Sequence, residues 1–167
     1  MTMQTVDTSK LWDMIRDIRF GMLTVRGSDG RLYSRPMTTQ NRAADQGGVI
    51  WFFLSRTGQQ VADVTASPEV NVTYSDSASD RYVSVSGTAR LVEDQAKMEE
   101  LWNSDAQRRF PGGIEGSDLA LVAILVAEAE YWDVKADKAV QIFKLVRAAL
   151  SGEEPADLAE HRRVRMR

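Results

Sequence analysis

The residues with the clearest potential for chemistry are Ser55, Arg56, Thr57 and Gly58, which directly follow the apolar run VIWFFL at 49–54. Two hydroxyls, a guanidinium and a glycine stand together where the apolar spacing opens a short helix. The free backbone N–H groups of a helix start, together with such donors, suit a phosphate group. The turn therefore predicts a phosphate-bearing ligand, against the plainer alternative of an ordinary capped turn.

A second candidate segment, Arg35-Pro36-Met37-Thr38, lies one strand earlier. Pro36 lacks a backbone N–H, which usually marks the edge of a sheet or an irregularity in it. At such a place the backbone can meet a flat ligand, and Arg35 offers a fork of donors to a phosphate or a ring carbonyl. The alternative is that Arg35 is a solvated strand residue and Met37 part of the core.

The composition excludes several other kinds of site. There is no cysteine and one histidine, His161, so thiolate chemistry, a zinc cluster and a Ser-His-Asp triad are not expected. A net charge of −3 predicts no general affinity for nucleic acid. No apolar run is long enough to span a membrane, and the first ten residues lack the pattern of a signal peptide. We expect a cytoplasmic protein.

The elements that would position these residues are mostly strands. A first helix carries Leu11, Ile15 and Ile18 at helical spacing, and further short helices are expected after Gly58, after Asp94 and over 139–150. A Ser-Asp-Gly turn at 28–30 predicts a hairpin, and Gly87 predicts a bulge or a close backbone approach. The strands are expected at 20–26, 31–39, 49–54, 70–74, 82–92, 119–126 and 130–134, the last two separated by a turn near Glu128.

About six main strands without an alternating βαβ pattern favour a mainly β fold, a six-stranded antiparallel barrel with short helices. The expected domain covers 1–152, and residues 153–167 form a charged C-terminal tail with the basic run HRRVRMR. A run of this kind is usually solvated.

Several segments carry a family resemblance. RPMTTQ at 35–40, the strand IWFFLS with its following turn, YVSVSGTARLVED at 82–94, LWNSDAQRRFPGG at 101–113 and AEYWDV at 129–134 occur in this order. Together they resemble the general stress protein 26 branch of the pyridoxamine 5′-phosphate oxidase-like proteins, from about Trp12 to about Gly152. The resemblance implies the FMN-binding type of split β-barrel.

The resemblance also implies where a flavin would lie. Its ring system is expected along 35–38, its phosphate near the turn after the third strand, and a tryptophan near the ring; a place in the barrel core is the alternative for that tryptophan. The cofactor-binding residues implied are Arg35, Pro36, Met37, Thr38, Phe53, Ser55, Arg56, Thr57, Gln60 and Trp132.

Two departures from the family pattern matter. Gln59-Gln60 stand where relatives carry a lysine or an Arg-Lys pair, and a neutral donor binds phosphate less strongly than a charged one. The C-terminal His161-Arg162-Arg163 does not reproduce the RxHxR type of motif by which the oxidases proper hold their substrate. Oxidation of vitamin B6 is therefore not the expected activity.

By this resemblance we expect a flavin-binding stress protein that acts as a flavin-dependent oxidoreductase on an unknown substrate. FMN is the first choice of cofactor, with FAD or a deazaflavin as alternatives. The expected assembly is a homodimer with the flavin at the subunit interface, and a nicotinamide dinucleotide is the expected electron donor. A deazaflavin-dependent reductase and a non-catalytic flavin-binding protein are the alternatives; haem, which needs an axial ligand, ranks last.

Overall fold

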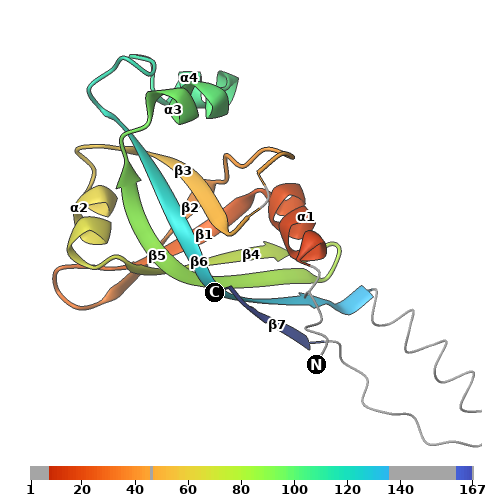
Figure 1. The fold of residues 1–167 in the computed structure, drawn as a ribbon. Coiled ribbons are helices and arrows are strands. Elements are labelled where there is room, and N and C mark those ends of the chain that lie inside the picture. Colours follow the sequence, from red (N-terminus) through yellow and green to blue (C-terminus); the bar gives the residue numbers. More distant parts are fainter. Residues whose placement is uncertain (1–7, 46, 136–160, 167) are drawn as a thin grey trace, which may run out of the picture.

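A single antiparallel sheet forms the body of the molecule in the computed structural model, which describes residues 8–45, 47–135 and 161–166 (Figure 1). Its order is β2-β1-β4-β5-β6-β3, and β7 pairs with β6 beside this path. The expected mainly β antiparallel split barrel is confirmed; the last two expected strands form one strand, β6, and β7 is additional. The strands are β1 (Phe20–Arg26), β2 (Leu32–Thr38), β3 (Val49–Ser55), β4 (Glu69–Asp76), β5 (Arg81–Val92), β6 (Leu119–Asp133) and β7 (His161–Arg165).

The barrel is split between β2 and β3. These strands follow one another in the sequence, yet they lie at opposite ends of the sheet order. In the described residues they form no ladder with each other, and the Gln40 N–H, just after β2, donates to the Trp51 carbonyl at 2.9 Å. The expected hairpin is confirmed, because β1 and β2 pair from Phe20 opposite Thr38 to Arg26 opposite Leu32. Within the described part of the chain, one edge of β2 is therefore left without a strand partner, as Pro36 predicted.

A bulge interrupts the pairing of β5 with β6. Ser86 lies opposite Glu128 but Gly87 lies opposite Val126, which leaves Ala127 as the extra residue. A Cβ on Gly87 would stand 2.3 Å from the Leu125 carbonyl oxygen, so only glycine fits here. The predicted irregularity at Gly87 is confirmed. The predicted turn near Glu128 is wrong: β6 runs unbroken, because the bulge absorbs the extra residue without ending the strand.

Two groups of helices cover the barrel. In Figure 1, α1 (Ser9–Ile18) and α2 (Gln59–Ala66) lie on opposite sides of it, while α3 (Gln95–Leu101) and α4 (Ser104–Arg109) sit at the top. Leu11 and Ile15 of α1 are fully buried, as the helical spacing predicted, and Ile18 packs against the same core. The predicted start of α3 is confirmed by Asp94, whose carboxylate accepts a hydrogen bond from the Lys97 N–H at 3.0 Å.

Apolar side chains form two clusters on the two sides of β3. Ile50, Phe52 and Leu54 point into the barrel interior, whereas Phe53 belongs to a smaller cluster beneath α3 and α4. That smaller cluster contains Phe53, Met98, Leu101, Ala106, Leu119 and Leu121, with Trp51, Val92, Trp102, Phe110 and Ile114 packed against it. Both faces of β3 are therefore covered, which is why its sequence shows no alternation.

The C-terminal run does not stay unpaired. Residues 161–165 form β7 against β6; Val164 is 3% exposed, and Arg163 forms ion pairs with Glu128 and Glu130. The expectation of a solvated run is wrong for these residues. The basic composition does not reveal that Val164 faces inward or that Arg163 has two acidic partners on β6. The helix expected over 139–150 lies outside the described residues. Among those that are described, no helix is long and apolar enough to cross a membrane.

Candidate functional site

The start of α2 lies against β2 beside the split in the barrel. Tyr33, Arg35 and Met37 share one face of β2, because side chains alternate along a strand. Met37 is 6% exposed, and the Gln60 amide lies 3.7 Å from its sulfur. Of the predicted site residues, the structure thus brings Arg35, Met37 and Gln60 together at one place.

A pocket of about 220 Å³ opens next to this contact, between the β1–β2 turn and α2. We call it the hairpin pocket. Arg35 lines it and forms no ion pair with any described residue, so its guanidinium is available to a ligand. The lining residues are Gly27, Ser28, Asp29, Tyr33, Arg35, Gln59 and Asp63.

A second cavity of about 440 Å³ lies at the other end of β2, where α4 approaches it. We call it the α4 groove. Its walls combine apolar surface with two guanidiniums, and its Phe20 ring is 63% exposed. Asp105 accepts hydrogen bonds from Arg19 at 3.0 Å and from Arg108. The lining residues are Phe20, Pro36, Met37, Thr38, Asp105, Arg108 and Arg109. Sequence reasoning missed the α4 arginines, because only the docking of α4 brings them to β2.

The turn Ser55-Arg56-Thr57 is already occupied by the chain's own acids. Oδ1 of Asp118 lies 2.7 Å from the Ser55 hydroxyl and 2.9 Å from the Thr57 hydroxyl. These bonds, that of Ser55 foremost, hold the pKa of Asp118 below its usual value. Arg56 forms a forked ion pair with Glu93 at 2.8 and 3.2 Å. In this structure the anions that the turn holds are carboxylates of the chain itself, and the phosphate contact stays a prediction.

Asp118 was not a sequence-predicted residue, and no local pattern could have found it. It stands more than sixty positions after the turn, and reaches it because Ser55 pairs with Leu119 when β3 joins β6. A long-range strand pairing of this kind leaves no trace in the sequence near Ser55.

Two other predicted residues lie apart from β2. Phe53 is buried beneath the α3–α4 segment, where its ring meets Trp102 edge-on with centroids 5.6 Å apart. Trp132 lies opposite Tyr82 near the end of β6, whereas Leu119, opposite Ser55, begins the same strand. Within one chain, Trp132 and the Ser55 turn thus stand at opposite ends of β6.

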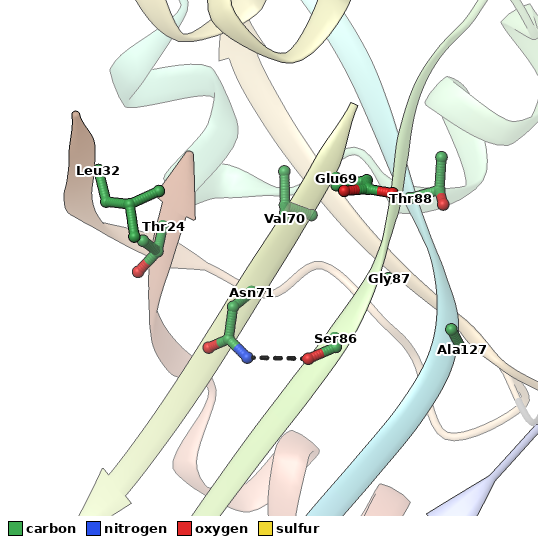
Figure 2. A pocket seen from close by; sticks show the side chains of 9 residues that line it. All are labelled: Thr24, Leu32, Glu69, Val70, Asn71, Ser86, Gly87, Thr88 and Ala127. Carbon is green, nitrogen blue, oxygen red and sulfur yellow. Dashed lines mark hydrogen bonds between the residues drawn. The ribbon is translucent and has the colours of Figure 1, made fainter. Parts of the chain in front are cut away.

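A third groove, of about 390 Å³, runs over the outer face of β1, β4, β5 and β6 (Figure 2). Its floor is rich in hydroxyl and amide groups, and Asn71 donates to the Ser86 hydroxyl at 3.3 Å. The bulge at Gly87 and Ala127 forms one side. The charged side chain among its lining residues is Glu69, so this groove lacks the cation that a phosphate needs.

Comparison with known proteins gives a consistent result. The family model described as pyridoxamine 5′-phosphate oxidase like matches residues 6–156. No curated protein matches the chain. Among solved structures, one assigned as general stress protein 26 from a Jannaschia species is 29% identical with a TM-score of 0.72, covering 95% of this chain and 98% of its own.

Two further structures extend the comparison. The general stress FMN/FAD binding protein of Xanthomonas citri is 33% identical with a TM-score of 0.65, covering 74% of this chain and 85% of its own. A pyridoxamine 5′-phosphate oxidase-related, FMN binding protein from Nostoc punctiforme is 11% identical with a TM-score of 0.61 over the full length of both chains. At that identity the last comparison supports the fold alone.

Proposed function

The chain belongs to the pyridoxamine 5′-phosphate oxidase like family, and we propose that it binds a flavin. The proposed site lies beside the split in the barrel, where the start of α2 meets β2. The observation that carries the proposal is Arg35, which forms no ion pair with any described residue and stands on the edge strand β2, where Gln60 meets Met37. FMN or FAD fits the proposal, in line with the FMN/FAD binding of the Xanthomonas citri relative.

The residues at the split fit a flavin in three ways. Arg35 would donate to a phosphate oxygen or a ring carbonyl. The unpaired edge of β2 offers backbone N–H and C=O groups to the polar edge of the ring. Phe20 and Pro36 of the α4 groove supply an apolar surface for a flat face of the ring, and they keep water from that side of it.

The hydroxyls expected to bind the flavin phosphate already have a partner. Ser55 and Thr57 donate to Asp118 in this structure, so a phosphate reaches their hydroxyls only if that carboxylate moves away. Arg35 has no such bond to a described residue, and Gln60 contacts Met37, two positions along the same face of β2. We therefore assign the main phosphate contact to Arg35.

We also propose that the site is completed by a second copy of the chain. Trp132 lies far along β6 from the Ser55 turn, so a contact between Trp132 and the flavin fits a partner subunit. The outer face of the β1–β2 hairpin exposes Phe20, Met22 and Leu32, and such a cluster is typical of a covered surface.

Any reaction would use the bound flavin, which supplies electron transfer. The protein's own part would be to hold the phosphate at Arg35, fix the ring against β2 and exclude water. The activity we propose is accordingly that of a flavin-dependent oxidoreductase, with a nicotinamide dinucleotide as electron donor. A deazaflavin in place of the flavin would have the same requirements at Arg35.

The test is to purify the protein without added cofactor, record its visible spectrum and identify by mass what heating releases. We expect FMN or FAD, and a deazaflavin would be distinguished by its mass. Arg35→Ala should weaken flavin binding by about ten-fold or more. Arg90→Ala, which removes an exposed arginine of β5 outside both pockets, is the matched control. A colourless protein that also failed to quench the fluorescence of added FMN and FAD would refute the proposal.

A further inference from the structure

The hairpin pocket contains a buried carboxylate with an incomplete set of donors. Asp63 of α2 is 7% exposed, and its Oδ1 accepts one hydrogen bond, from the Gln59 amide at 2.9 Å. The structure gives the Asp63 carboxylate no other hydrogen bond and no ion pair with a described residue. A buried carboxylate normally has several donors, because leaving water costs it much free energy. A ligand with hydroxyl or amine donors would complete this set.

The same pocket holds an aromatic ring in a fixed position. The Tyr33 hydroxyl donates to Oδ2 of Asp29 at 2.5 Å, and the ring lies against Gly27, where a Cβ would stand 2.7 Å from a ring carbon. Although its ring is held by these two contacts, Tyr33 stays 43% exposed. A rigid, exposed aromatic ring is a platform on which a base can stack with little loss of entropy.

The charges of the pocket favour a ligand with one anionic end and one donor-rich end. Arg35 suits phosphate oxygens, whereas Asp29 and Asp63 repel them. The hydrogen bond from Tyr33, its strongest influence, keeps the pKa of Asp29 below its usual value, so this group is ionised at neutral pH. A phosphate centred in the pocket would face both carboxylates. A nucleoside phosphate can place its phosphates at Arg35 and its hydroxyls and amine at the acids.

We propose that the hairpin pocket binds the adenosine diphosphate part of a dinucleotide, namely that of FAD. The diphosphate lies at Arg35, the adenosine donates to Asp63, and the adenine stacks on Tyr33. The assignment rests on the proposed flavin site, which adjoins the pocket through the contact of Gln60 with Met37. FMN ends at its phosphate and would leave the Tyr33 ring and the Asp63 carboxylate without a ligand contact. A nicotinamide dinucleotide carries the same adenosine diphosphate.

The test compares the affinities of the flavin-free protein for FAD and FMN by fluorescence quenching. We expect wild type to bind FAD about ten-fold more tightly than FMN. Tyr33→Leu should abolish the difference by weakening FAD alone, and Asp63→Asn should reduce it. Tyr33→Phe keeps the ring and should keep the preference. Arg90→Ala, which removes an exposed arginine of β5 outside the pocket, is the control and should change neither affinity.

The outcomes separate this inference from the proposed function. If FMN binds and FAD is not preferred, the reduction of FMN-loaded protein by NADH tests whether the pocket binds a nicotinamide dinucleotide instead. A KM for NADH raised about ten-fold in Tyr33→Leu, with kcat unchanged, assigns the pocket to the nicotinamide dinucleotide; an unchanged KM overturns the inference. If no flavin binds, the flavin proposal fails, and calorimetry with ADP tests the pocket alone. ADP binding lost in Tyr33→Leu then supports the pocket, and absence of ADP binding overturns it.

Discussion

Replacing Gly87 by alanine tests the bulge on which the long strands β5 and β6 depend. The new methyl carbon would stand 2.3 Å from the Leu125 carbonyl oxygen and 3.1 Å from the Ile124 side chain. A carbon and a carbonyl oxygen normally approach to no less than about 3.3 Å, so the backbone of β6 must move by about 1 Å. Leu125 is paired on both sides, with Thr88 of β5 and Val49 of β3, and the movement disturbs both ladders.

The expected cost follows from these contacts. Overpacking of this kind costs about 1–3 kcal/mol, and each ladder hydrogen bond lost adds about 1 kcal/mol. We therefore expect Gly87→Ala to lower the free energy of unfolding by about 2–5 kcal/mol. Urea unfolding followed by circular dichroism, at one fixed protein concentration because of the expected dimer, should show a midpoint lower by about 1–2 M.

The matched control is Gly112→Ala. A Cβ there would meet only the Cα of Gly116 at 3.5 Å, an ordinary contact, so the midpoint should stay within about 0.3 M of wild type. If Gly87→Ala unfolds at the same urea concentration as this control, the close approach at the bulge is not the constraint that we infer.

Three further predictions concern the site and its support. Gln60→Lys should tighten FMN about ten-fold without affecting riboflavin, which lacks the phosphate; equal tightening of both in a fluorescence titration would contradict the phosphate contact. Asp45 lies 2.7 Å from Lys97, and although burial opposes it, a backbone N–H and Lys97 lower the pKa of Asp45 from 3.8. The contribution of the Asp45 carboxylate to the free energy of unfolding is present above its pKa in the unfolded state. It is lost as the pH falls through its pKa in the folded state. Wild type should therefore lose about 1 kcal/mol of stability between about pH 5 and pH 3. Lys97→Met lacks the ion pair and should not show this loss when both proteins are unfolded in urea. Phe53→Leu removes the ring contact with Trp102 and should cost about 0.5–1.5 kcal/mol beyond the lost area; unfolding equal to wild type would contradict it.

The strand pattern was largely predictable from the sequence because it depends on local rules. The hairpin turn at 28–30, the apolar run of β3 and the glycine of the bulge each act over a few residues. The continuous β6 was not predictable, because Glu128 is a polar residue whose ion pairing depends on a distant arginine of β7. The strand β7 was not predicted either, because it forms only through its pairing with the distant β6.

The candidate site was predictable in part. Arg35 and Met37 lie together because they share one face of β2, and the start of α2 brings Gln60 to Met37. The occupation of the Ser55 turn by Asp118, and the approach of the α4 arginines to Pro36, depend on strand pairing and helix docking over long sequence distances. Residue types near the turn indicate what could bind an anion, but they do not tell which anion the fold itself supplies.

The position of β3 has a consequence for how the protein is made. In the described residues the strand partner of β3 is β6, whose last residue follows the end of β3 by 78 positions (Ser55 to Asp133). At about 5–20 residues per second a ribosome takes about 4–16 s to synthesise that stretch. During this interval VIWFFLS is an apolar strand without a partner, the kind of segment that aggregates. Nascent chains that stall before β6 should therefore depend on chaperones, whereas chains that have released β6 should not.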